Sequence, residues 1–276
     1  MTQPMKAAPS ASDIRRCARG MLDGGRGQRL TLVLAVITVL TAGVGAYMLG
    51  AATYAVGYLI AGDSLWADVA AYAVMGMLGL FGVLPLMMGA YRLACLAYPP
   101  RENGVELPRV TAAPTLGEVL HPFTSWRAYG RSMAVGLEHL GWFTLMAVIP
   151  VVGDRVLTLV LDYLTEAGYL MEEWFEPLVA LGGLGFLVFG LLMFFLSGYR
   201  AGFAYLAFVH DPLPLGEVNR YFKGFRRSFI RPFVLRVSLL GWVAVSILAV
   251  LVPFVAHTIP YGMCCSAVYG GELERK

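Results

Sequence analysis

The chain has 276 residues, of which 58% are hydrophobic and only 14% are charged. A water-soluble domain usually carries about 25% charged residues, so this composition excludes an ordinary soluble protein. The formal net charge of +3 is small, and we expect no nucleic-acid partner. Runs of roughly 20 apolar residues can cross a bilayer as helices, so the sequence predicts an integral membrane protein.

The predicted fold is all-α, a polytopic bundle of about six membrane spans. Only four residues separate the first two spans, so they form an antiparallel hairpin. The final span contains Pro253 and Pro260, which makes a five-span protein the alternative. We expect the spans at residues 30–61, 66–98, 133–152, 178–209, 233–252 and 253–273.

An acidic segment at 153–177 separates the third and fourth spans. Its apolar residues recur at helical spacing, which indicates a helix. Two placements remain open for this helix. It either lies on the membrane surface or prolongs the third span.

Basic residues gather before the first span, between the second and third, and between the fourth and fifth. Acidic residues gather instead in the segment 153–177. Lysine and arginine concentrate on the cytoplasmic side of membrane proteins. We therefore expect a multi-pass protein of the bacterial plasma membrane with a cytoplasmic N-terminus.

Two short motifs occur twice. The letters LGEV at 116–119 and 215–218 each precede LGW, at 140–142 and 240–242. The sequence predicts repeat units at 12–98, 115–209 and 214–273, which form one membrane domain after a disordered tail at 1–11. Glycine permits close helix approach and tryptophan fills the adjoining groove, so we expect packing positions at Gly141, Trp142, Gly241 and Trp242.

Each repeat unit begins with an amphipathic segment that has a basic face. The middle segment also contains Thr115 and Glu118, spaced as a capping box. Basic amphipathic helices suit the surface of an anionic leaflet, so membrane lipids with anionic headgroups are the expected partners. The basic residues of the first and last segments are Arg15, Arg16, Arg19, Arg220, Lys223, Arg226 and Arg227.

Several polar residues lie inside or at the ends of predicted spans. An ionisable group within a bilayer is costly, which makes Glu138 a candidate site or the partner of a nearby arginine. The arginines Arg92 and Arg200 end long spans, where they snorkel to lipid phosphates or line a headgroup cavity. The remaining candidates are His139 and His257, each a packing residue or a cavity residue.

Sequence signatures of catalysis are scarce. The four histidines and four cysteines show no metal-ligand spacing, and there is no P-loop or G-x-S-x-G motif. We therefore expect no catalytic residues, no metal and no cofactor, and a protein that is not an enzyme. An enzyme acting on lipid would have only Glu138 and His139 as a polar cluster.

The last 78 residues carry a series of short motifs: Asp211-Pro212, Gly241-Trp242, Pro260-Tyr261, Tyr269 and Glu272-Leu273. In this series the chain resembles the bacterial domain-of-unknown-function family 975. The acidic segment 153–177 and Gly270-Gly271 depart from the family pattern. The resemblance implies a polytopic plasma-membrane protein and brings no established activity.

These observations favour a non-enzymatic protein that interacts with lipid, organises the membrane or supports another membrane protein. The alternative is a transporter or export permease subunit with a cavity near Glu138, since many transporters contain internal repeats. A membrane-protein partner or a homo-oligomer fits either interpretation.

Overall fold

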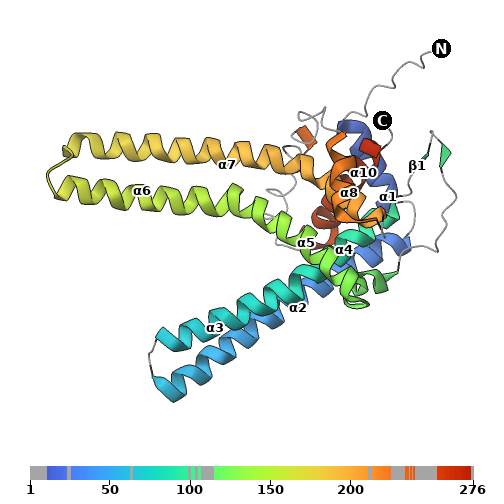
Figure 1. Ribbon diagram of the computed structural model, residues 1–276, viewed down its shortest axis with the longest axis horizontal. Coiled ribbons are helices and arrows are strands. Elements are labelled where there is room, and N and C mark those ends of the chain that lie inside the picture. Colours follow the sequence, from blue (N-terminus) through green and yellow to red (C-terminus); the bar gives the residue numbers. More distant parts are fainter. Residues whose placement is uncertain are drawn as a thin grey trace, which may run out of the picture. The chain divides into compact units, whose positions relative to one another are not determined.

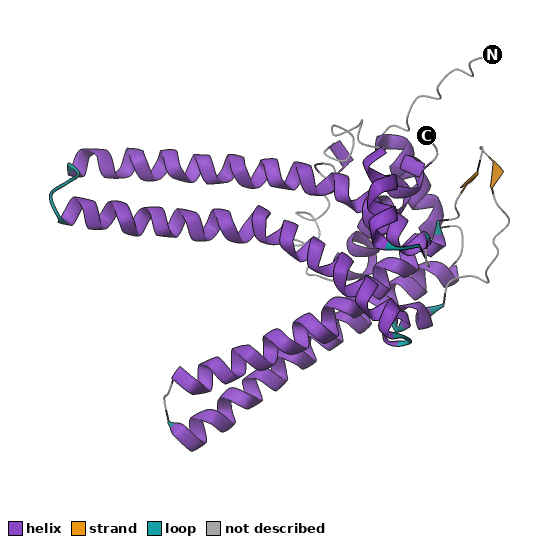
Figure 2. Cartoon of the chain, in the orientation of Figure 1, coloured by secondary structure: helices purple, strands orange, loops and turns teal. Residues whose placement is uncertain are grey.

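The structure, a computed structural model, is mainly helical in its described residues, which also form a short strand pair (Figures 1 and 2). The strands β1 (Arg101–Glu102) and β2 (Val105–Glu106) pair antiparallel. Most of the predicted span at 233–252 lies outside the described residues. The described residues are 11–23, 26–62, 65–98, 101–102, 105–106, 115–210, 213–224, 234–235, 237, 239 and 254–274.

The chain forms two compact units. Unit 1 contains residues 1–136 and 201–276, and unit 2 contains residues 137–200. Two helices have residues in both units. These helices are α5 (Trp126–Phe143) and α7 (Glu172–Val209).

The first apolar helices of unit 1 form a long antiparallel hairpin. Helix α2 (Arg26–Ala61) packs along α3 (Leu65–Leu78), and Gly62 makes the turn at a φ of 68°. The π-helical turn η1 (Gly79–Val83) joins α3 to α4 (Leu84–Ala97). Leucine, methionine and aromatic side chains are exposed all round the hairpin, as expected of helices that lipid surrounds.

The remainder of unit 1 is a cluster of helices with a well-buried core. Helix α1 (Ala11–Asp23) packs on α10 (Ile259–Glu274), and α10 also contacts α4 and α2. A further π-helical turn, η5 (Phe254–Thr258), precedes α10. The first and last described helices of the chain therefore lie against each other.

The amphipathic pattern of α1 is confirmed, but protein covers its apolar face. Ile14 is 1% exposed and Ala18 is completely buried, whereas Arg16 and Arg19 are exposed. Because α1 packs on α10, its apolar side chains face protein where the sequence suggested lipid.

Helix α8 (Leu215–Gly224), like α1, buries apolar residues against protein and leaves a basic residue exposed. Its apolar residue Phe222 is buried and meets Phe203 of α7 edge-on, with ring centroids 5.9 Å apart. Val218 is buried as well, while Arg220 is exposed. The basic face of this helix is thus the face that remains open.

The middle amphipathic segment is not a helix. It forms two short 3₁₀ turns, η2 (Leu116–Val119) and η3 (His121–Phe123). Proline at position 122 has no backbone N–H and disfavours a continuous helix. The predicted capping box is also wrong, because Thr115 makes no side-chain cap bond.

Unit 2 consists of a second long hairpin. The π-helical turn η4 (Thr144–Val148) connects α5 to α6 (Ile149–Glu166), and α7 begins after a short turn. Gly168 has a φ of 76° in this turn, a value that glycine adopts without strain. Of the two placements left open for the acidic segment, the one that prolongs the third span is correct.

In the described part of the chain, four helices are long and apolar enough to cross a membrane, in agreement with the predicted membrane protein. Each exceeds the roughly 20 residues that a bilayer requires, and the third has 41 residues. The spans are Arg29–Ile60, Leu65–Ala97, Trp126–Glu166 and Glu172–Met193.

The π-helical turns η1, η4 and η5 each end shortly before a proline. These prolines are Pro85, Pro150 and Pro260 respectively. In η1 the N–H of Leu84 bonds the carbonyl five residues back, at Gly79. A proline ring lacks the N–H and collides with the carbonyl four residues earlier, so the helix widens locally. Pro85, for example, has no N–H for the carbonyl of Phe81, the normal helical acceptor four residues earlier.

Candidate functional site

Two arginines converge on the last turn of α7 in unit 1. The final four carbonyl groups of a helix have no N–H partner within the helix and carry the negative end of its dipole. Arg92 of α4 reaches the carbonyl oxygen of Phe208, and Arg131 of α5 reaches that of Ala207. Guanidinium groups from two other helices therefore cap this helix end.

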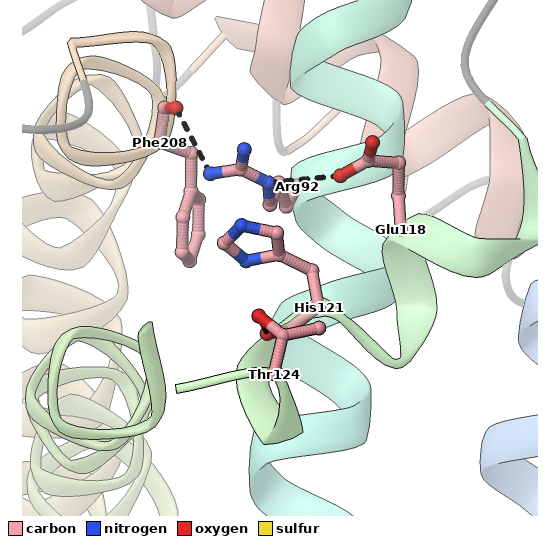
Figure 3. A network of polar contacts seen from close by, with 5 residues as sticks. All are labelled: Arg92, Glu118, His121, Thr124 and Phe208. Atoms are coloured by element: carbon pink, nitrogen blue, oxygen red, sulfur yellow. Dashed lines mark hydrogen bonds and ion pairs between the residues drawn. The ribbon is translucent and has the colours of Figure 1, made fainter. Parts of the chain in front are cut away.

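Arg92 lies between α7 and the turn η2. Its Nε donates to the Oε2 of Glu118 at 3.1 Å. Its Nη1 donates to the backbone carbonyl oxygen of Phe208 at 3.4 Å (Figure 3). The side chains of His121 and Thr124 border the same space. The guanidinium for which the sequence suggested lipid phosphates or a headgroup cavity thus binds protein groups.

Arg131 is the residue that sequence reasoning missed. It is only 7% exposed, and it donates hydrogen bonds to the carbonyl oxygens of Ala207 and Leu213. It thereby ties the end of α7 to the loop that leads into α8. A signal was present, because Arg131 shares a helix face with the apolar residue Val135, which is also buried.

This arrangement holds helices in place. A guanidinium that binds a carboxylate or backbone carbonyls is geometrically fixed and always charged. The cluster therefore defines where α4, η2, α5 and α7 meet.

The candidate acid Glu138 has an arginine partner within unit 2. Arg200 of α7 forms an ion pair with Glu138 of α5. The two side chains are 25% and 19% exposed respectively. Pairing removes much of the cost of placing a carboxylate among apolar helices.

The other polar candidates are separate from these two clusters. His139 is half-buried, and His257 stacks on Tyr261 with ring centroids 5.6 Å apart and an interplanar angle of 5°. The stacked ring of His257 matches the packing alternative for that residue.

The glycine–tryptophan motif is described in one copy. Trp142 is half-buried, and open space surrounds the position that a Cβ on Gly141 would occupy in the described part of the chain. Gly141 therefore shows no close helix approach there. The second copy, Gly241 and Trp242, lies outside the described residues.

The basic residues on α1 and α8 form the open faces of those helices. Arg15 is half-buried, whereas Arg16, Arg19 and Arg220 are exposed. The side chain of Lys223 and the residues Arg226 and Arg227 lie outside the described part of the chain. Within the described ranges, no three His, Cys, Asp or Glu side chains gather as a metal site.

Neither a protein-family model, nor a curated protein, nor a solved structure matches this chain.

Proposed function

We propose that this protein is a multi-pass membrane protein that binds anionic lipid headgroups through the basic faces of its surface helices. In this proposal it organises lipid or supports other membrane proteins, and it has no catalytic activity. Six spans, three repeat units and a cytoplasmic N-terminus in a bacterial plasma membrane belong to the same proposal. The resemblance to family 975 agrees with such a location.

The observation that carries the proposal is the way α1 is oriented. Its apolar face is buried on α10, so Arg16 and Arg19 face outward without needing to insert the helix into lipid. A basic residue close to an anionic leaflet contributes about 1 kcal/mol of attraction. The helix is therefore a fixed cationic surface, supported from behind by protein.

A lipid count on the whole protein tests this function. We would extract the protein in polymer-bounded native discs and measure the ratio of anionic to zwitterionic lipid by mass spectrometry. The substitution pair Arg16→Gln and Arg19→Gln should lower this ratio, with a steeper fall at low salt. An unchanged ratio would refute the headgroup role of α1.

A matched control removes charge elsewhere. Glu172 and Glu173 are exposed in the first turn of α7, so replacing both with glutamine changes two charges without touching α1. We expect this variant to retain the wild-type lipid ratio. The glutamate pair raises the net charge by two and the arginine pair lowers it by two, so a rise in the ratio as large as the fall in the α1 variant would mean that net charge, and not the α1 face, sets the ratio.

One observation favours a transporter as the second candidate. The ion pair between Glu138 and Arg200 joins two long apolar helices, where titratable pairs mark ion pathways. Proteoliposomes loaded with a pH-sensitive dye would show whether the protein conducts protons. Flux that disappears in Glu138→Gln supports this function, whereas flux equal to empty liposomes counts against it.

A further inference from the structure

An open cavity of about 670 Å³ lies where α7 passes into α8 in unit 1. Its lining residues are His210, Leu213, Glu217, Val218 and Arg220. This volume falls within the range of small-molecule sites in proteins. The proposed headgroup role of the basic helix faces includes Arg220 but none of the other four lining residues.

The walls of this cavity are held by hydrogen bonds. Arg131 donates to the carbonyl oxygen of Leu213, and the N–H of Leu213 donates to the carbonyl oxygen of His210 at 2.8 Å. On the α8 side, the N–H of Val218 donates to the carbonyl oxygen of Pro214 at 3.1 Å. These bonds fix His210, Leu213 and Val218 on both sides of the cavity, and preformed walls lower the entropy cost of binding.

The lining carries both signs of charge. Glu217 and Arg220 are three residues apart on α8, so they lie on one helix face, and both are exposed. His210, directly after α7, lines the same cavity. Leu213 and Val218 provide apolar surface beside these charges.

We propose that this cavity binds the phosphoethanolamine headgroup of a phospholipid. Arg220 and His210 bind the phosphate, Glu217 accepts hydrogen bonds from the primary ammonium, and Leu213 contacts the apolar part of the lipid. The proposal rests on the proposed function, because a bilayer supplies the ligand.

The lining also argues against other headgroups. A headgroup with only negative charge would meet the carboxylate of Glu217 without an ammonium to offset the repulsion. A trimethylated choline cannot donate a hydrogen bond to Glu217, and none of the described lining residues is a Phe, Tyr or Trp that would bind it by cation–π contact.

Short-chain lipids added to the full-length protein in detergent would test this site. The probes are dihexanoyl phosphatidylethanolamine, the matching phosphatidylcholine and phosphatidylglycerol, and O-phosphoethanolamine, with affinities measured by native mass spectrometry. We expect the ethanolamine lipid to bind about tenfold more tightly than the choline lipid, the effect of one charge-assisted hydrogen bond. Glu217→Gln should remove this preference, and Arg220→Gln should weaken binding of all the phosphate-containing probes.

Matched controls are available on helices far from this cavity in sequence. Glu172→Gln and Arg155→Gln change exposed charges on α7 and α6 and should leave the preference intact. Equal binding of ethanolamine and choline lipids by the wild type, or a preference that survives in Glu217→Gln, would overturn the proposal. Binding of O-phosphoethanolamine as tight as that of the lipid would overturn its lipid part.

The two proposals can fail separately. Arg16→Gln with Arg19→Gln lowers anionic lipid enrichment and should not alter the ethanolamine preference. Glu217→Gln should do the reverse. A normal thermal melt of Glu217→Gln and Arg220→Gln would show that these exposed substitutions leave the fold intact.

Discussion

The hydroxyl of Tyr129 donates a 3.0 Å hydrogen bond to the carbonyl oxygen of Phe81. Phe81 lies four residues before Pro85, so its carbonyl is the one that the proline deprives of a helical partner. Tyr129 belongs to α5, and Phe81 to the π-helical turn η1. Within unit 1, a side chain from another helix thus supplies the hydrogen bond that this carbonyl lacks within its own helix.

Replacing Tyr129 with phenylalanine should remove this bond and destabilise the protein by about 0.5–1.5 kcal/mol. The measurement is thermal unfolding of the purified protein in detergent. Pro85→Ala provides the control, because alanine restores an N–H for the Phe81 carbonyl. In that background Tyr129→Phe should have almost no effect, and full additivity of the two substitutions would contradict the pairing.

At the second proline, Pro150, the helices α6 and α7 pack closely because residue 190 is a glycine. A Cβ on Gly190 would lie 2.9 Å from the carbonyl oxygen of Met146, the group that Pro150 releases. Gly190→Ala should therefore push α7 away from α6 and cost roughly 1–3 kcal/mol. Gly185→Ala is the matched control, because the position of its Cβ is open space in the described part of the chain. Equal melting temperatures for the two variants would show that Gly190 makes no tight contact.

Arg131 should be the most sensitive arginine in unit 1. Arg131→Gln shortens the side chain and leaves the carbonyl oxygens of Ala207 and Leu213 without their donor. We expect a loss of roughly 2–4 kcal/mol and faster hydrogen exchange at the start of α8. Arg127→Gln on the same helix alters an exposed arginine and should change stability by less than about 0.5 kcal/mol. Unchanged exchange in α8 would mean that Arg131 does not hold the connecting loop.

The four cysteines should separate into two classes by reactivity. Cys17 on α1 is exposed, whereas Cys95, Cys264 and Cys265 are completely buried. Intact-protein mass spectrometry after brief maleimide treatment should show a single rapid adduct, and denaturant should release the remaining thiols. Rapid labelling of Cys264 in the folded protein would contradict the packing of α10 against α1 and α4.

The long apolar helices could be predicted from sequence, because length and composition alone determine whether a helix can cross a bilayer. The continuous helix through η4 was one of two alternatives, since helical spacing does not tell where a helix lies. Amphipathicity indicated that one face of α1 is buried but could not tell whether protein or lipid buries it.

The arginine cluster could not be predicted, because it depends on where α7 ends in space. Arg92 was identified by its position at the end of a span, and Glu118 by its place in a local motif. Their pairing with each other joins residues 26 positions apart and follows from tertiary packing. Arg131 binds backbone carbonyls, and no side-chain pattern in a sequence reveals that kind of partner.

The contact between α1 and α10 also determines when, during synthesis, unit 1 can finish folding. About 235 residues separate the two helices along the chain, which a ribosome adds in roughly 12–50 s. Throughout that interval α1 has been synthesised and the helix that covers Ile14 and Ala18 has not. A basic amphipathic helix suits the headgroup layer, so we expect the lipid surface to serve α1 as a temporary partner until α10 replaces it. Closure of unit 1 is then a late event of biogenesis, and a nascent chain truncated before α10 should still carry α1 on the membrane surface.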